Sequence, residues 1–216
     1  MQNVMLVVGV VVFAAILLRM NLWRAVLFLK PGAVHVELDT PADQMKLPDA
    51  LRPLAASLEA LGFRALGSRY EKTPLAAPFI SYDFAHPGER AFATVYLGRF
   101  ASPRLYFLTP LLGDGFVITA NFRRPARTVG THYVAAGVPG LSPDRLLKAH
   151  QRRLEGRDAL GAFDWEGRLT AAKSWVAGPG RAEIRWQNLN GLVSSVLSAS
   201  LLSLATYAAV RILVGR

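Results

Sequence analysis

Three arginines and one histidine are the residues of this sequence whose types and spacing point most clearly to chemistry. Arg123, Arg124 and Arg127 follow an apolar segment, and His132 lies a few residues further along the chain. Guanidinium groups bind phosphate or carboxylate through paired, charge-assisted hydrogen bonds. The segment therefore predicts an anion-binding site. The alternative is a solvated loop whose arginines cap strand ends and pair with scattered acidic residues.

The anion that suits this segment best is a lipid headgroup, because the same chain carries segments typical of membrane helices. Each basic residue close to an anionic membrane surface gains about 1 kcal/mol. A nucleic-acid partner is disfavoured, since no recognisable RNA-binding or helix-turn-helix signature accompanies the arginines. The sequence identifies no small-molecule ligand.

The sequence lacks the motifs of the common enzyme classes. None of its four histidines has a partner at metal-ligand spacing on a predicted helix, and it has no cysteine, so we expect no metal site. It also lacks a serine nucleophile elbow, a phosphate-binding loop and a dinucleotide fingerprint, and we expect no cofactor. His150 lies on the apolar side of its predicted helix, which favours a core histidine over a functional base. An enzyme would depend on His132 for proton transfer, as a hydrolase or transferase on an anionic or lipid-proximal substrate.

The middle of the chain alternates between strand and helix patterns. One apolar helical face runs through 48–61, and further helices are expected at 143–155 and 166–176. Short apolar or alternating segments predict strands at 34–38, 79–84, 91–97, 104–109 and 116–122, and 64–71 is a further candidate. Residues 123–140 are expected to form a loop. These patterns predict an α+β fold, an antiparallel sheet of four to five strands with flanking helices, between two transmembrane helices.

Both ends of the chain are apolar. Val4–Leu18 and its continuation to Leu29 predict one transmembrane helix, and Leu189–Val210, without a charge, predicts a second. A cleaved signal peptide is the alternative for the first segment, but a positive n-region and a small-residue cleavage site are missing. Trp23 and Trp186 are expected to anchor the helices at the membrane interface.

These segments divide the chain into three parts. We predict an N-terminal transmembrane helix with an interfacial extension over 1–30, an α+β polar domain over 31–186 and a C-terminal transmembrane helix over 187–216. Every acidic residue lies between Glu37 and Glu183, and 52% of all residues are hydrophobic. This distribution excludes an ordinary soluble protein, a disordered chain and a disulfide scaffold.

Small residues recur every four positions in the second apolar segment: Gly191, Ser195, Ala199 and Ser203. On a helix they form a stripe that lets another backbone approach closely. The partner is the first span, a second copy of the chain or another membrane protein. The alternative is that small residues are simply tolerated in a span, with hydroxyls bonded to carbonyls one turn earlier.

Lysine and arginine residues near the two spans predict the orientation. On the domain side lie Arg19, Arg24, Lys30, Lys173, Arg181 and Arg185. The opposite side has only Arg211 and Arg216. Because positive residues collect on the cytoplasmic side, we expect the domain in the cytoplasm, on a bacterial cytoplasmic membrane. The predicted function is a membrane-anchored binding or assembly module without catalysis, with the lipid bilayer and a further helix as partners.

Overall fold

The computed structural model describes residues 2–214, which divide into two compact units. Unit 1 contains the chain up to Val34, residues 73–77 and the chain from Gly180 onward; unit 2 contains residues 35–72 and 78–179. The helices are α1 (Gln2–Leu29), α2 (Arg52–Ala60), α3 (Pro143–Leu154), α4 (Trp165–Ala177) and α5 (Gly180–Val214). Short 3-10 turns lie at Pro31–Ala33, Asp49–Leu51 and Arg99–Ala101. The strands are β1 (His35–Pro41), β2 (Arg64–Lys72), β3 (Phe79–His86), β4 (Ala91–Leu97), β5 (Pro103–Leu111), β6 (Gly115–Ala120), β7 (Arg127–Val129) and β8 (Tyr133–Gly137).

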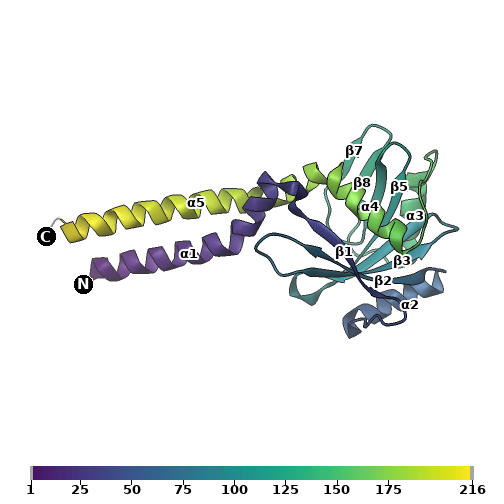
Figure 1. Ribbon diagram of the computed structural model, residues 1–216, viewed down its shortest axis with the longest axis horizontal. Coiled ribbons are helices and arrows are strands. Elements are labelled where there is room, and N and C mark those ends of the chain that lie inside the picture. The colour runs from purple at the N-terminus through teal and green to yellow at the C-terminus, as the bar shows by residue number, and fades with distance from the viewer. Residues whose placement is uncertain (1, 215–216) are drawn as a thin grey trace. The chain divides into compact units, whose positions relative to one another are not determined.

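Unit 2 is built on one curved sheet. Among residues 2–214 the sheet has eight strands in the order β1-β2-β3-β4-β5-β6-β8-β7 (Figure 1). Every neighbouring pair is antiparallel except β6 and β8, which are parallel. The α+β class is therefore confirmed and the sheet is mostly antiparallel, as expected, but the predicted size of four to five strands is wrong.

The additional strands arise where the sequence indicated a loop. β7 has only three residues, and three of the five residues of β8 are alanine or glycine, so neither segment has a run of β-branched and aromatic residues long enough to mark a strand. β8 also pairs with β6 in parallel, which requires a connection that crosses back along the sheet. Such pairing depends on tertiary packing, and local patterns do not reveal it.

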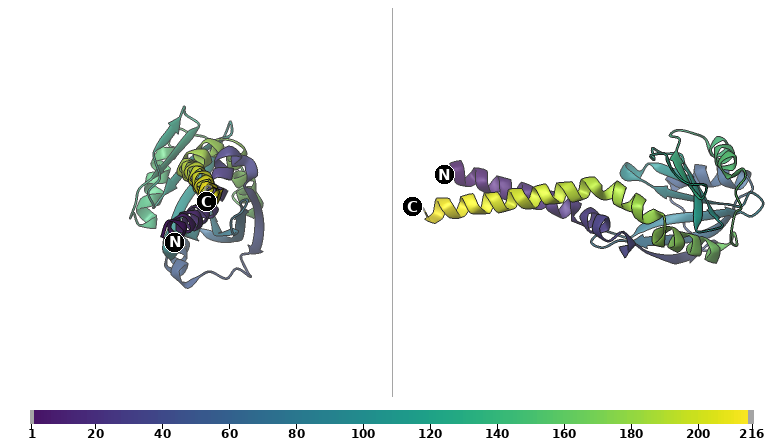
Figure 2. Two further views of the ribbon diagram at one scale, coloured as in Figure 1. Left: turned by 90° about the vertical axis from the view of Figure 1, so that its left-hand side faces the viewer. Right: turned by 90° about the horizontal axis from the view of Figure 1, so that it is seen from above.

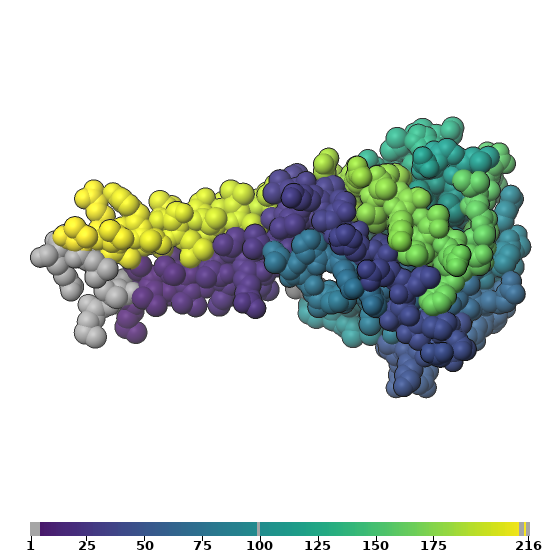
Figure 3. Space-filling model, viewed as in Figure 1, coloured from purple at the N-terminus to yellow at the C-terminus, as the bar shows by residue number. Residues whose placement is uncertain are grey.

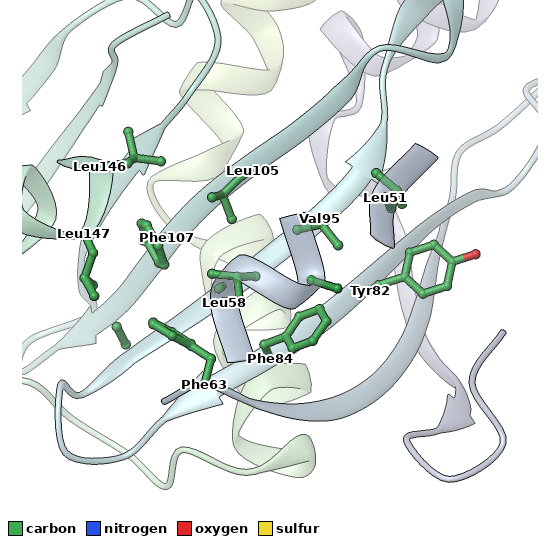
Figure 4. Packing of buried hydrophobic residues seen from close by; sticks show 13 residues of the cluster. Leu51, Leu58, Phe63, Tyr82, Phe84, Val95, Leu105, Phe107, Leu146 and Leu147 are labelled. Atoms are coloured by element: carbon green, nitrogen blue, oxygen red, sulfur yellow. The ribbon is translucent and has the colours of Figure 1, made fainter. Parts of the chain in front are cut away.

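One face of the sheet packs against α2 and α3. Leu58 of α2 lies over Phe84 and Phe63, and Leu146 and Phe107 pack together nearby (Figure 4). All five side chains are almost completely buried. Burying a side chain of this size stabilises the fold by about 1.5–3 kcal/mol. The apolar stripes that predicted these two helices are therefore their sheet-facing sides.

The opposite face of the sheet is covered by α4. Ala171 of α4 packs with Phe92, Ile118 and Tyr133 in a second apolar cluster. Asp164 begins the helix, because its Oδ1 accepts a hydrogen bond of 2.7 Å from the Gly167 amide. Figure 1 shows α2 and α4 on opposite sides of the sheet, which gives unit 2 three layers.

Unit 1 contains two helices that are long enough and apolar enough to cross a membrane, over Met5–Leu29 and Gly180–Arg211. They run side by side in opposite directions (Figure 2). The space-filling view shows their side chains in contact along the pair (Figure 3). At 1.5 Å per residue, 25 helical residues extend roughly 38 Å, which exceeds the ~30 Å hydrocarbon core of a bilayer.

The buried side of α5 follows a spacing of three and four residues. Its members are Ile184, Asn188, Gly191, Ser195, Ser198 and Ala205. A Cβ on Gly191 would overlap the Cβ of Arg24, so the two helices approach each other closely there. Arg24 also donates a hydrogen bond of 2.9 Å from Nη2 to the Gln187 carbonyl.

The predicted small-residue stripe coincides with this buried side only at its beginning. Gly191 and Ser195 are buried, whereas Ala199 and Ser203 are exposed. Positions four residues apart advance by about 40° around a helix at each step, whereas alternating steps of three and four keep facing the partner. The contact with α1 therefore continues through Ser198 instead. The side with Ala199 and Ser203 faces away from α1.

Candidate functional site

One end of the sheet in unit 2 collects positive charge. From Arg90 to Pro143 the chain has six arginines and a single acidic residue, Asp114. Asp114 lies in the β5–β6 turn. The end of β4, the start of β5 and the end of β6 lie together at the other end of the same strands, because Leu97 pairs with Pro103 and Tyr106 with Ala120.

We call five residues at this end the arginine edge: Tyr96, Arg104, Phe122, Arg123 and Arg124. Tyr96 and Arg104 are paired across β4 and β5. The Arg104 guanidinium lies over the Phe122 ring, 4.9 Å from its centroid, and the rings of Tyr96 and Phe122 are 5.9 Å apart, edge to face. Stacking uses the flat face of a guanidinium and leaves its in-plane N–H groups to bind oxygen atoms.

The backbone around Arg123 and Arg124 is held by the end of β8. The Gly137 amide donates to the Arg124 carbonyl at 3.2 Å, and the Asn121 Oδ1 accepts a 2.8 Å hydrogen bond from the Leu105 amide. A Cβ at Gly137 would overlap the Phe122 carbonyl oxygen. Only a glycine lets this segment approach β8 so closely. Arg123 is exposed, and Arg124 is half-buried, with its guanidinium 5.9 Å from the centroid of the Trp175 ring.

The phenol of Tyr96 stays protonated at the arginine edge. Burial and the neighbouring Tyr106 raise the pKa of Tyr96 to about 12, against an opposing effect of Arg104 and Arg124. Its ring packs 4.9 Å from that of Phe79. Tyr96 is therefore a neutral support for the charged groups around it.

A buried network of charged residues lies next to the edge, between the sheet and α4. Asp83 accepts hydrogen bonds from Arg69 Nε at 2.6 Å, from Arg168 Nε at 3.1 Å and from the Thr94 hydroxyl at 2.5 Å. Both arginines also donate to the Tyr106 hydroxyl at 2.9 Å. Arg69, Asp83, Thr94 and Arg168 are at most 1% exposed.

This network attaches α4 to the sheet. Burial lowers the pKa of Arg69, but Asp83, Tyr106 and Glu71 outweigh it, so the pKa lies well above its ordinary value. The half-buried Glu71 accepts a 2.5 Å bond from Arg69 Nη1. Two guanidinium groups thus face two carboxylates, and the charges balance. Because buried ions are costly unless they are paired, the network fixes the position of Arg168 and of its helix.

His150 is a structural residue that lies fully buried beside Phe107, in the core between the sheet and the helices α2 and α3. Its Nε2 lies 2.9 Å from the Thr109 hydroxyl, which itself donates to the Arg90 carbonyl, so Nε2 carries the proton. Its Nδ1 lies 3.1 Å from the Thr119 hydroxyl and accepts from it. Burial, together with the charge of Arg153, lowers the pKa of His150 from 6.5 to about 3. The ring is therefore neutral, fully buried and already paired on both nitrogens.

The four predicted anion-binding residues do not form one cluster. Arg123 and Arg124 lie at the arginine edge, whereas Arg127 begins β7, where it pairs with Ala135. His132 precedes β8 at the end of the β6–β8 pairing opposite Gly137, and the five residue steps from His132 to Gly137 extend roughly 17 Å at 3.3 Å per residue. Its ring is exposed and forms no hydrogen bond with any residue from 2 to 214. Residues 2–214 contain no group of three metal-ligating side chains.

Sequence patterns missed Arg104 and the buried network. Arg104 joins Phe122 only through the pairing of β5 with β6, and Arg168 is 85 residues from Asp83. One feature of the sequence could have revealed the buried network. Asp83 stands inside the apolar segment Phe79–Ala85, where a charge in a strand requires a buried partner. No protein-family model, curated protein or solved structure matches the chain.

Proposed function

We propose that this protein is a membrane-anchored binding module whose arginine edge binds anionic groups. The observation that carries the proposal is that Arg104, Arg123 and Arg124 lie together at one end of the sheet. Asp114, the single acidic residue between Arg90 and Pro143, lies at the opposite end of the sheet. Phosphate and carboxylate oxygens are the natural acceptors for such a set of donors. The rigid strands and the glycine contact behind the edge prepare it for binding without rearrangement.

The two apolar helices supply the anchor. We propose that α1 and α5 both span a bacterial cytoplasmic membrane, with unit 2 in the cytoplasm. The support is the excess of lysine and arginine flanking the spans on the side of unit 2. Trp23 and Trp186 serve as interfacial anchors in this arrangement. The exposed side of α5 that contains Ala199 and Ser203 offers a surface for a further helix, from a second copy or another membrane protein.

The alternative function, a tethered hydrolase or transferase, depends on a proton-transfer group beside the anion site. His132 is the residue that such an enzyme would use, and it lies away from Arg123 and Arg124. His150 is buried between two threonines and is out of reach of a substrate. The binding module is therefore the better supported function.

The proposal is tested by anion binding in the absence of anionic lipid. The full chain is reconstituted in nanodiscs of neutral phosphatidylcholine and titrated with inorganic pyrophosphate in a calorimeter. Wild type is expected to bind, and the Arg123→Gln/Arg124→Gln variant to bind roughly a hundredfold more weakly, because two charge-assisted hydrogen bonds are lost. The single variant Arg123→Gln removes only an exposed side chain, which separates lost binding from lost folding.

The matched control removes the same charge from exposed positions on α3, as Arg145→Gln/Arg152→Gln. It is expected to bind pyrophosphate like wild type. Equal affinities in the edge variant, the control and wild type would refute the arginine edge as the binding site, and so would a wild-type protein that binds no pyrophosphate.

A further inference from the structure

We propose that the anionic partner of the arginine edge is the surface of the membrane that anchors the chain, and that Phe100, at the tip of the β4–β5 hairpin, inserts into its interface. This inference rests on the proposed function and names its ligand. The occupant is an anionic lipid bilayer, recognised by arginines that bind phosphate groups and by an aromatic side chain that enters the headgroup region.

The hairpin tip presents Phe100 to the surroundings in an unusual conformation. Phe100 is 87% exposed, the most of any large hydrophobic residue whose side chain the structure describes. It has φ 59° and ψ 34°, and Ala101 beside it has φ 55°. Two successive residues other than glycine in the left-handed region cost conformational energy, and such strain is typical of functional positions. The hairpin is closed below them by a 2.8 Å hydrogen bond from the Gly98 amide to the Ser102 carbonyl.

Further apolar and basic side chains lie at the same end of the sheet. Phe79 and Ile80, at the start of β3, are 36% and 45% exposed. Phe79 packs on Tyr96 of the arginine edge, which links the apolar residues to Arg104 and Phe122. A surface of aromatic rings flanked by arginines suits the water–lipid interface. The rings enter the headgroup layer, while the guanidinium groups bind lipid phosphates.

The path of the chain favours a bilayer over a soluble partner. His35, the first residue of β1, pairs with Lys72 at the end of β2, so the chain enters the sheet at the same end. Residues 30–34 connect α1 to β1 and can span at most about 18 Å. Residues 178 and 179 alone connect α4 to α5. If both apolar helices cross the membrane, these short connections keep lipid headgroups at a high effective concentration near the sheet.

A single spin label at position 100 tests this directly, because the chain has no cysteine. The full-length Phe100→Cys variant is labelled and reconstituted in vesicles of phosphatidylcholine and phosphatidylglycerol. Electron paramagnetic resonance then measures the accessibility of the label to oxygen, which concentrates in lipid, and to a water-soluble nickel complex. The matched control is Leu112→Cys, a position that is 56% exposed near the β5–β6 turn, at the opposite end of the sheet.

The label at position 100 is expected to be shielded from the nickel complex at least threefold better than the label at position 112, and to be more accessible to oxygen. Adding Arg123→Gln to the labelled variant is expected to reduce this difference. Equal accessibility of the two labels to the nickel complex would overturn the inference. If pyrophosphate still binds to the protein in neutral nanodiscs, the proposed function survives that result. Immersion of the label without any pyrophosphate binding would instead support lipid contact and refute the proposed function.

Discussion

Neutralising Asp83 is expected to destabilise unit 2 far more than a surface substitution does. In Asp83→Asn the new amide presents a donor to Arg69 and Arg168, where a carboxylate accepted three hydrogen bonds, one of them from Thr94. Both guanidinium groups are at most 1% exposed; Arg69 then keeps Glu71 as a carboxylate partner, whereas Arg168 loses the carboxylate with which it pairs. Removing one partner of a buried ion pair costs about 3–5 kcal/mol, and we expect a loss of that size in the free energy of unfolding.

The assay is urea unfolding of the full chain in detergent micelles, followed by brief proteolysis that cleaves only unfolded protein. The control Glu59→Gln alters an exposed carboxylate on α2 and is expected to change stability by less than ~0.5 kcal/mol. A cycle with Arg168→Met should show a coupling of about 0.5–3 kcal/mol to Asp83→Asn. A loss below about 1 kcal/mol for Asp83→Asn would refute the view that this network holds α4 on the sheet.

Three other predictions follow from the packing. Between pH 7 and pH 5, the free energy of unfolding of wild type should fall by about 2 kcal/mol more than that of His150→Gln, as measured by urea titration. The reason is that the unfolded chain protonates His150 below pH 6.5, while the folded ring stays neutral down to about pH 3. Equal losses would contradict the burial of His150. Gly191→Leu should separate α5 from Arg24 and weaken cysteine cross-linking between α1 and α5, whereas Val196→Leu on the exposed side should not. Gly137→Ala should displace the segment that carries the edge arginines and weaken pyrophosphate binding in nanodiscs at least tenfold; unchanged affinity would contradict the preformed edge.

The elements that the sequence predicted well are those whose partners are close in the chain. Each signal is local: the apolar face of 48–61 repeats within one short segment, and the start signals at Ser142 and Pro143 are adjacent. Accordingly, α2 and α3 begin and end near the expected positions. The strands from β3 to β6 follow the same rule, since short turns connect them and each alternates or is apolar. Local patterns were enough for these parts of unit 2.

The elements that the sequence did not predict depend on distant partners. β8 has an alanine-rich sequence, and it becomes a strand because the edge of β6 is available beside it. Arg69 and Arg168 look like surface arginines in the sequence, and both are buried because Asp83 lies between them. The candidate site shows the same division. Arg123 and Arg124 stand out as a pair, whereas the hairpin that adds Arg104 and the exposed ring of Phe100 is a property of the folded sheet.

The proposed function depends most on α1 and α5 being two membrane spans that hold unit 2 on the cytoplasmic side. The most direct test places one cysteine at Glu155 in unit 2 and, in a separate protein, one cysteine appended after Arg216, and treats intact cells with a membrane-impermeant maleimide. We expect the appended cysteine to react in intact cells, the cysteine at position 155 to react only after lysis, and both proteins to resist alkaline extraction from membranes. Labelling of position 155 in intact cells would contradict the cytoplasmic position of unit 2, and release of either protein by alkali would contradict the membrane spans.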